Sequence, residues 1–287
     1  MIKTLSRSKT YNISFLLFIV LYFVFLFAPL LVVCILAFNN SMFPSLPWKG
    51  FTLDWFFGQG EGGKTGIFHD AINLRAIFVS LRTAICVSVL STIIGTCAAF
   101  LFEQENFRFK NVLYFLMLAP VVIPGVILGI SILLFTNLVG TFLDEYTGIY
   151  LKFLRPGFWL VVFGQFSFIT TLVTLIIMAR LKKFDKSFED AAYDLGATRF
   201  QTIWHITLKF LSPSIIGGAA MAFLMSFENF NTTVFLLGSE PTLPINLYMR
   251  VRDGSTPVIN SISFLLILFT SLFAVGNLFF SKKNTNK

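Results

Sequence analysis

Charged residues are scarce in this sequence. Asp, Glu, Lys and Arg together make up 13 % of the 287 residues, whereas they supply about a quarter of an average soluble domain. Hydrophobic residues account for 56 %, and Phe alone occurs 37 times. This composition excludes an ordinary soluble domain and favours a chain that lies mostly within a lipid bilayer.

Residue types that carry catalysis or bind metals are equally sparse. The three cysteines, Cys34, Cys86 and Cys97, all lie within apolar runs, which favours buried structural thiols over a disulfide or a metal site. His69 and His205 are far apart, and neither has a neighbour at the spacing of a metal ligand. The sequence also lacks a glycine-rich phosphate loop, a nucleophile elbow and an HExxH motif. We therefore expect no catalytic residue, no metal site and no cofactor of its own, and a membrane enzyme is disfavoured.

Long apolar stretches are what the sequence has in abundance. A helix needs about 20 residues to cross the hydrocarbon core of a bilayer, and six stretches approach or exceed that length with almost no charge. The first is too long for a signal peptide and lacks a small-residue cleavage site before Asn39, so we expect an uncleaved helix. The pattern predicts an all-α integral membrane protein with one transmembrane domain over residues 1–287. The predicted spans are residues 15–38, 84–102, 112–135, 157–179, 214–237 and 258–280.

The distribution of Lys and Arg predicts the orientation of the chain. If the N-terminus is cytoplasmic, the cytoplasmic segments hold 14 of the 22 Lys and Arg residues, so both termini are expected inside. The net charge of +8 then reflects this topology and contact with anionic membrane lipid, and it gives no support for a nucleic-acid partner. Residues 180–212 become a cytoplasmic loop. Residues 39–74 and 238–257 become external loops rich in Pro and Gly, which either dock a soluble partner or are solvated connectors.

The cytoplasmic loop contains the longest polar interruption, "SFEDAAYDLGATRFQTIWHITLKF", residues 187–210. Two capping-box patterns, one at Ser187 and one at Thr198, predict two short helices, with Gly196 as a left-handed residue between them. One face of the first helix is predicted to carry Phe188, Ala191, Ala192 and Leu195, and one face of the second Phe200, Ile203, Trp204 and Thr207 or Leu208. The low profile of the paired alanines suits insertion into a groove of another protein. An amphipathic hairpin on the membrane surface is the alternative.

The segment "EDAAYDLGA…HITLKF" resembles the EAA signature of the permeases of ABC importers. The matching positions are Asp190, Ala191, Ala192, Gly196, Ile206 and Leu208. Asp190 replaces the usual Glu, although Glu189 precedes it, and Lys209 stands where Pro is typical. The resemblance implies that this loop, Glu189 included, couples the chain to an ATPase subunit.

The resemblance extends over nearly the whole chain. Segments such as "LAPVVIPGVILGISILLF", "SFENFNTTVFLLG" and "TLPINLYMRVRDGSTPVINSIS" are similar to the second permease subunit of spermidine/putrescine importers. This implies a MetI-like, six-helix permease in the bacterial cytoplasmic (inner) membrane. It also implies a second permease subunit, a cytoplasmic dimer of subunits that bind the ATP, and a periplasmic substrate-binding protein.

Two features within the predicted spans bear on the path of the solute. Pro120, Pro124 and Gly125 predict a kink in the third span, either structural or acting as a hinge. Glu228 is a carboxylate well inside the fifth span, and such a group is expected to face a cavity or a partner.

We interpret Glu228, with Asn229 and Asn231, as part of the path of a cationic solute such as a polyamine. A structural hydrogen bond is the alternative role for Glu228. Polyamine-type relatives often carry two acidic residues here, whereas this chain has one, so a non-polyamine organic solute stays open. An ATP-independent channel or carrier is disfavoured by the resemblance to the coupling loop.

Overall fold

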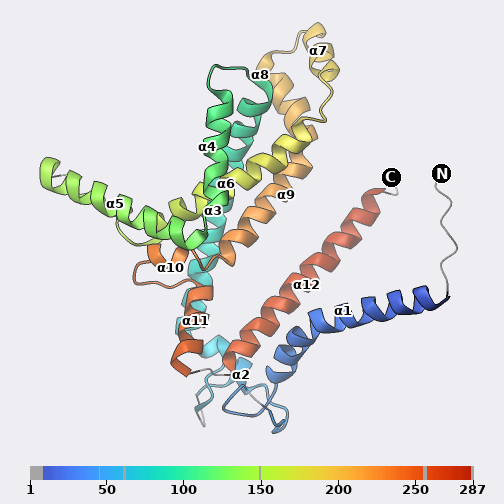
Figure 1. The fold of residues 1–287 in the computed structure, drawn as a ribbon, viewed down its shortest axis with the longest axis vertical. Helices are drawn as coiled ribbons and strands as arrows, with labels where there is room; N and C mark the ends of the chain where they lie inside the picture. Colours follow the sequence, from blue (N-terminus) through green and yellow to red (C-terminus); the bar gives the residue numbers. More distant parts are fainter. Residues whose placement is uncertain (1–8, 45, 61–62, 149, 255–256, 286–287) are drawn as a thin grey trace. The chain divides into compact units, whose positions relative to one another are not determined.

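The computed structural model describes residues 9–44, 46–60, 63–148, 150–254 and 257–285 (Figure 1). Contacts divide the chain into two compact units. Unit 1 comprises residues 1–74 and 247–287, and unit 2 comprises residues 75–246. The single transmembrane domain inferred from the sequence stays a prediction.

Helices make up the structure, and no named strand occurs among the described residues; only two isolated bridges, Asn39–Phe51 and Gln59–Thr65, are found there. The long helices are α1 (Lys9–Leu36), α3 (Ala71–Gln104), α5 (Gly125–Thr147), α6 (Phe158–Leu181), α9 (Leu208–Phe227) and α12 (Val258–Thr285). Five helical stretches in the described part of the chain are long and apolar enough to cross a membrane, and the apolar residues Val258–Leu272 of α12 form a shorter one. The all-α membrane fold class is confirmed.

The helix α6 is the most deeply buried of these stretches and forms the centre of unit 2. Its buried face carries Val162, Ile169, Val173 and Ile177, which pack with residues of α3 and α9 such as Val87 and Leu211. Polar contacts reinforce this packing, because Thr170 Oγ1 lies 3.1 Å from Ser91 Oγ of α3, and Thr171 Oγ1 donates to Met117 O at 2.6 Å. Side-chain hydrogen bonds between helices are a common way to hold membrane helices together.

The predicted second span is longer than the sequence pattern indicated. The sequence predicts a short helix near residues 70–77 and a separate span from residue 84, but α3 runs through both without a break. Asp70 begins the helix, since its Oδ1 accepts the backbone N–H groups of Ile72 and Asn73 at 3.0 and 3.2 Å. Cys97 of α3 is exposed on this chain, so the prediction of a buried thiol is wrong for this cysteine.

The predicted third span is two helices. α4 (Lys110–Val122) ends before Ile123, which has an extended backbone, and α5 begins after Pro124. A residue that precedes proline is pushed out of the helical region, which explains the break at this point. Figure 1 shows that α5 leaves in a different direction from α4. The predicted kink is therefore a full interruption, whereas Pro120 lies inside α4 without ending it.

The predicted fifth span is also interrupted. α9 ends at Phe227, residues 228–232 are not helical, and the short α10 covers Thr233–Leu236. At its other end α9 continues without a gap from a π-helical turn, η4 (Ile203–Thr207), and from α8 (Arg199–Thr202).

Unit 1 joins the first and last long helices, because α1 packs against α12. Ser261 of α12 donates a hydrogen bond to Ala37 O at 3.2 Å, and Phe264 stacks edge-on against Phe38 at 5.0 Å between ring centres. The loop that follows α1 is irregular, as predicted, and contains α2 (Asp54–Phe57) and the 3₁₀ turn η2 (Ile67–His69). In this loop the buried Trp55 indole donates to Asn39 O at 2.9 Å.

Candidate coupling loop, solute path and outer pocket

The polar segment folds into two short helices with a sharp turn between them. α7 (Ser187–Asp194) ends in a hydrogen-bonded turn in which Gly196 N–H donates to Tyr193 O and Ala197 N–H donates to Ala192 O, at 2.9 and 3.0 Å. This is the Schellman arrangement, in which the residue after the helix is left-handed. Gly196 has φ +83°, and a Cβ added there would meet nothing within 4 Å. The predicted left-handed glycine is confirmed, and it is needed for its backbone conformation rather than for space.

One of the two predicted capping boxes is present. Thr198 N–H donates to Gln201 Oε1 at 2.9 Å, and Gln201 N–H donates back to Thr198 Oγ1 at 3.4 Å. The predicted box at Ser187 is wrong, because Lys186 occupies the N-cap and makes no side-chain cap bond. Instead Asp185 accepts the Ser187 N–H at 3.0 Å. That bond, with a second from the Ser187 hydroxyl, lowers the pKa of Asp185, so the carboxylate stays ionised at the positive end of α7.

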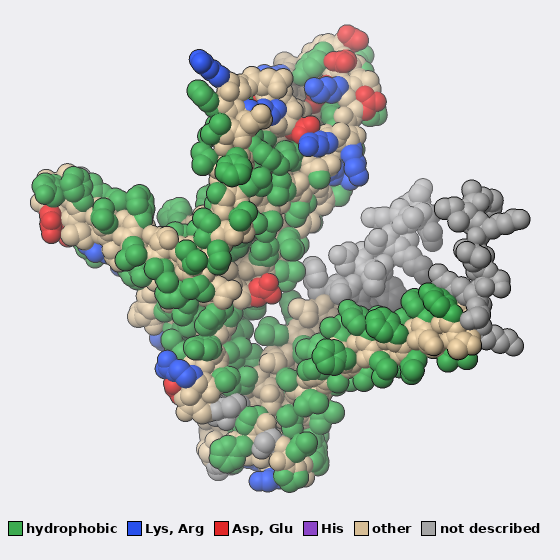
Figure 2. All heavy atoms as spheres, in the orientation of Figure 1, with side chains coloured by type: hydrophobic (Ala, Val, Ile, Leu, Met, Phe, Trp, Pro, Cys, Tyr) green, Lys and Arg blue, Asp and Glu red, His purple; other side chains and the backbone are tan. Residues whose placement is uncertain are grey.

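Only part of the predicted apolar face of α7 is buried against the rest of the chain, and the other residues of that face are exposed. Ala192 is buried, whereas Ala191 is exposed and Leu195 is 89 % exposed. On the second helix Phe200 and Trp204 are exposed and stacked, with ring centres 6.1 Å apart. Figure 2 shows Lys, Arg, Asp and Glu side chains gathered at the end of unit 2 that carries α7 and α8. Large apolar side chains grouped on such a charged end mark a candidate contact surface, either for another protein or for the membrane surface.

Glu189 makes a hydrogen bond within the chain. Its Oε1 accepts the hydroxyl of Thr207 at 2.7 Å, and Thr207 is fully buried in the π-helical turn. This bond ties α7 to the base of α9. Of the other motif residues Asp190 is exposed, while Ile206 and Leu208 are half-buried. The sequence places Thr207 or Leu208 on one face of the second helix but does not reveal the bond to Glu189, because nothing local links this Thr to a Glu 18 positions earlier.

The three residues predicted for the solute path lie together in the break after α9. Glu228 is the C-cap of α9 and is exposed, as is Asn231. Asn229 is half-buried, and its Oδ1 accepts the hydroxyl of Thr233 at 2.8 Å. Within the described residues no side-chain hydrogen bond or ion pair reaches the Glu228 carboxylate. The prediction that Glu228 sits inside a continuous helix is wrong, since the helix ends there.

The first turn of α5 packs directly on this break. A Cβ added to Gly129 would lie 2.9 Å from Thr232 O, and one added to Gly125 would lie 3.1 Å from Asn231 Cβ. Thr232 in turn donates to Gly125 O at 3.3 Å. Sequence reasoning assigned Gly125 to a kink, whereas the structure shows that Gly125 and Gly129 let two backbones approach closely.

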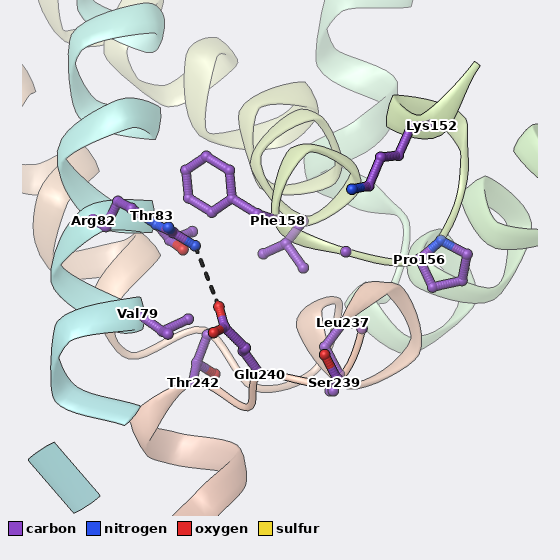
Figure 3. A pocket seen from close by; sticks show the side chains of 13 residues that line it. Val79, Arg82, Thr83, Lys152, Pro156, Phe158, Leu237, Ser239, Glu240 and Thr242 are labelled. Atoms are coloured by element: carbon purple, nitrogen blue, oxygen red, sulfur yellow. Dashed lines mark ion pairs between the residues drawn. The ribbon is translucent and has the colours of Figure 1, made fainter. Parts of the chain in front are cut away.

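A pocket of about 220 Å³ lies at the end of unit 2 formed by residues 237–242 and the start of α6 (Figure 3). On one wall the Arg82 guanidinium lies 3.6 Å from the Glu240 carboxylate and 4.1 Å from the centre of the Phe158 ring. Figure 3 shows the Lys152 side chain entering from the opposite wall. Among the described residues Arg82 Nε and Thr242 Oγ1 are buried without a hydrogen-bond partner. The pocket is therefore lined by two cationic side chains, Arg82 and Lys152, and by one carboxylate, Glu240. Two of its hydrogen-bond donors have no partner within the described chain.

From the sequence, the charges of the external loops expected to contact a binding protein are those of Arg250 and Arg252, and no pattern points to the charges of the pocket. In the structure Arg250 and Arg252 differ from each other. Arg250 forms a partly buried ion pair with Asp70 at 2.6 Å, and Arg252 pairs with the adjacent Asp253 at 3.0 Å. Arg250 is therefore part of the structure of unit 1, where its partner also begins α3.

An all-helical membrane chain that combines this coupling loop with a polar break in a membrane helix is a transport permease. The chain belongs to the family described as binding-protein-dependent transport system inner membrane component, whose sequence profile matches residues 91–284. It is thus a multi-pass inner-membrane permease subunit of an ABC importer, and not an enzyme, because in this family ATP hydrolysis resides on a separate subunit.

Individual relatives agree with this assignment. The chain is 32 % identical over 251 residues to the putrescine transport system permease protein PotI of Escherichia coli (strain K12), which covers 85 % of this chain and 82 % of PotI. It is 25 % identical over 264 residues to the spermidine/putrescine transport system permease protein PotC of the same strain, with 92 % of each chain covered.

A solved structure shows the same fold at lower identity. It is a bacterial alginate ABC transporter in complex with an alginate pentasaccharide-bound periplasmic protein, with a TM-score of 0.70 and 18 % identity. The match covers 92 % of this chain and 91 % of that chain.

Substitution of Gly196 tests the turn of the coupling loop. Gly196→Val places a β-branched residue at φ +83°, which we expect to cost about 1–2 kcal/mol and to distort the turn. Uptake by the assembled importer should fall about fivefold or more while its ATP hydrolysis continues. Gly148→Val is the matched control, because Gly148 is also left-handed with open space around it but ends α5. Equal uptake in the Gly196 and Gly148 variants would contradict a coupling role for this turn.

Substitution of Thr207 tests the bond between α7 and the π-helical turn. Thr207→Val keeps the shape but removes the hydroxyl that Glu189 accepts, which we expect to cost about 1–3 kcal/mol. Hydrogen exchange of the backbone amides of residues 187–194 should then accelerate about tenfold. Thr202→Val is the control, since Thr202 is equally buried but bonds only to Thr198 O in its own helix. Unchanged exchange in the Thr207 variant would show that the bond does not hold α7.

Proposed function

We propose that this chain is one of two different permease subunits of an importer for an amine cation of the putrescine or spermidine type. A periplasmic binding protein delivers the cation, and a cytoplasmic ATPase dimer drives the importer. Both termini are cytoplasmic in this proposal, so the end with α7 and α8 faces the ATPase. The observation that carries the proposal is the unpartnered Glu228 carboxylate in the break of a membrane helix.

The chemistry of the break supports a cationic solute. A carboxylate within a bilayer costs at least about 2.5 kcal/mol unless it faces a cavity or a partner, and Glu228 has no partner within the described chain. An ammonium group stripped of water needs an anion or carbonyl oxygens in return. Glu228 supplies the anion, and the neighbouring exposed Asn231 supplies an amide oxygen. PotI is a permease protein of a putrescine transport system and PotC of a spermidine/putrescine transport system, which supports the same class of solute.

A non-polyamine organic solute is the alternative. The alginate transporter shares the fold at 18 % identity, so the fold alone does not select the solute. A single carboxylate also suits one ammonium group better than a chain of several. The charge of Glu228 therefore distinguishes a cationic solute from an uncharged or anionic one, because only a cation needs this charge.

The cytoplasmic end supports an ATPase partner. Phe188, Leu195, Phe200 and Trp204 are exposed on two short helices that the chain itself fixes through Gly196 and the Thr198 capping box. A rigid element with apolar side chains and a low Ala191 surface fits a groove in a folded partner. The bond between Glu189 and Thr207 then passes movement of α7 to the base of α9.

The outer pocket supports a docking position for the binding protein. Its lining residues come from the predicted external loops and from the ends of helices that adjoin them, and its volume of about 220 Å³ has room for a side chain of a docked protein. Its excess of cations and its two spare donors fit an acidic side chain of a docked protein. Arg250, which pairs with Asp70, is poorly suited to this role.

Removal of the Glu228 charge tests the proposed solute path. Glu228→Gln preserves size, so the importer should assemble and hydrolyse ATP normally while putrescine uptake falls about tenfold or more. Glu145→Gln is the control, because Glu145 is an exposed carboxylate at the far end of α5. Normal putrescine uptake by an assembled Glu228→Gln importer would remove this carboxylate from the path of a cation.

Reversal of the Lys152 charge tests the proposed docking position. Lys152→Glu leaves the pocket with one cation and two carboxylates, so binding of the importer's periplasmic protein to the nanodisc-embedded complex should weaken about tenfold. Weakening should be less at high salt, since exposed charges are screened. Lys110→Glu, at the start of α4, is the control. An affinity that does not change in the Lys152 variant would exclude this pocket from the docking surface.

A further inference from the structure

One buried side chain contacts both sides of the break after α9. Gln165 of α6 is fully buried in the apolar centre of unit 2. Its carbonyl oxygen Oε1 accepts the hydroxyl of Ser226, in the last turn of α9. Its amide Nε2 donates to the hydroxyl of Thr233, the first residue of α10, at 2.7 Å. The two helix ends that flank residues 228–232 are thus joined to a single amide group.

The network continues into the break itself. Thr233 accepts from Gln165 and donates its own hydroxyl to Asn229 Oδ1 at 2.8 Å, while its backbone N–H reaches the same oxygen at 3.3 Å. Ser226 and Thr233 are both buried, so water is not at hand to replace a lost bond. In such surroundings a chain of hydrogen bonds strengthens each member, and an unpaired member is costly.

Ordinary helix packing does not require this arrangement. Thr171, two turns along α6, also makes a buried interhelical hydrogen bond, but it binds only the carbonyl of Met117 in α4. An apolar residue at position 165 would fill the space without joining the ends of α9 and α10. The distinctive property of Gln165 is that its donor and its acceptor bind on opposite sides of an interruption.

We propose that Gln165 is a positioning residue that fixes the conformation of residues 228–232 and thereby sets the placement of Glu228. The consequence for solute transport rests on the proposed function of Glu228. The effect on the conformation of the break does not, and it can be measured without any solute.

The conformation is measured by thiol labelling. Asn231, which is exposed, is changed to Cys in a background in which Cys34, Cys86 and Cys97 are Ala. The complete importer in nanodiscs, open to reagent on both faces, is treated with a charged methanethiosulfonate. We expect Gln165→Leu to change the labelling rate at position 231 about fivefold or more, because the loop is no longer held. Thr171→Val, the control on the same helix, should leave the rate within about twofold of the parent.

A conservative variant separates loss of the bonds from general damage. Gln165→Glu in its protonated form keeps one acceptor and one donor, and burial favours that form. We expect it to restore labelling toward the parent rate, even if the Leu variant assembles poorly. Parent-like labelling in Gln165→Leu, or an equal change in Thr171→Val, would overturn the proposal. So would a failure of Gln165→Glu to differ from Gln165→Leu.

Uptake in the native-cysteine background completes the test. Gln165→Leu should reduce putrescine uptake about tenfold while ATP hydrolysis by the complex is retained, and Thr171→Val should not. If Glu228→Gln transports normally, the proposed path for the cation fails, but the labelling result at position 231 still decides the role of Gln165. If labelling changes and uptake does not, Gln165 fixes the break but the break does not limit transport, and the link to Glu228 is overturned.

Discussion

The structure depends on one constraint, which is that a backbone in lipid has to satisfy its own hydrogen bonds. A helix does so within itself, and an interruption is tolerated only where neighbouring groups supply the missing partners. At the break at residues 228–232, Glu228 N–H donates to Leu224 O, Asn229 N–H donates to Ser226 O, and Thr233 N–H donates to Asn229 Oδ1 at 3.3 Å. Gln165 binds the side chains of Ser226 and Thr233 on either side of the break, and Thr232 donates to Gly125 O of α5. The break between α4 and α5 relies on Pro124, which has no N–H to satisfy.

The same constraint explains why α6 occupies the centre of unit 2. Its polar residues include the buried Gln165 and Thr171 and the half-buried Thr170, each directed to a different neighbour, and apolar residues fill the space between them. Lipid offers no hydrophobic drive for helices to associate, so packing and such polar contacts have to hold them together. A helix that reads as uniformly apolar from its composition thus carries the few polar groups on which its neighbours depend.

The sequence was informative where the signal is local. The apolar runs predicted the membrane helices, and Gly196 and the Thr198–Gln201 pair predicted the shape of the coupling loop, because each depends on residues a few positions apart.

The sequence was misleading where a local pattern competes with distant partners. Ser187 has the pattern of a capping residue, but the side chain that accepts a backbone N–H at the start of α7 is that of Asp185. Pro124 predicted a kink, but the helix is interrupted there. Glu228 was predicted to lie inside a helix. The helix ends there instead, and the local pattern does not reveal this because the end is fixed by Gln165, which is far away in sequence. The bond between Thr207 and Glu189 and the outer pocket could not be predicted, since their members come from separate segments.

The π-helical turn has a consequence for the length of the coupling loop. A π turn holds one residue more than an α-helical turn, so η4 contains an insertion that the rest of the helix has absorbed. Each residue of an α-helix advances the direction of the side chains by about 100°. If this extra residue lay in a regular helix instead, Phe200 would be rotated by about that angle relative to α9. The wide turn therefore lets the chain carry one more residue between Gly196 and Ile206 while Phe200 keeps the direction it would have on a regular helix.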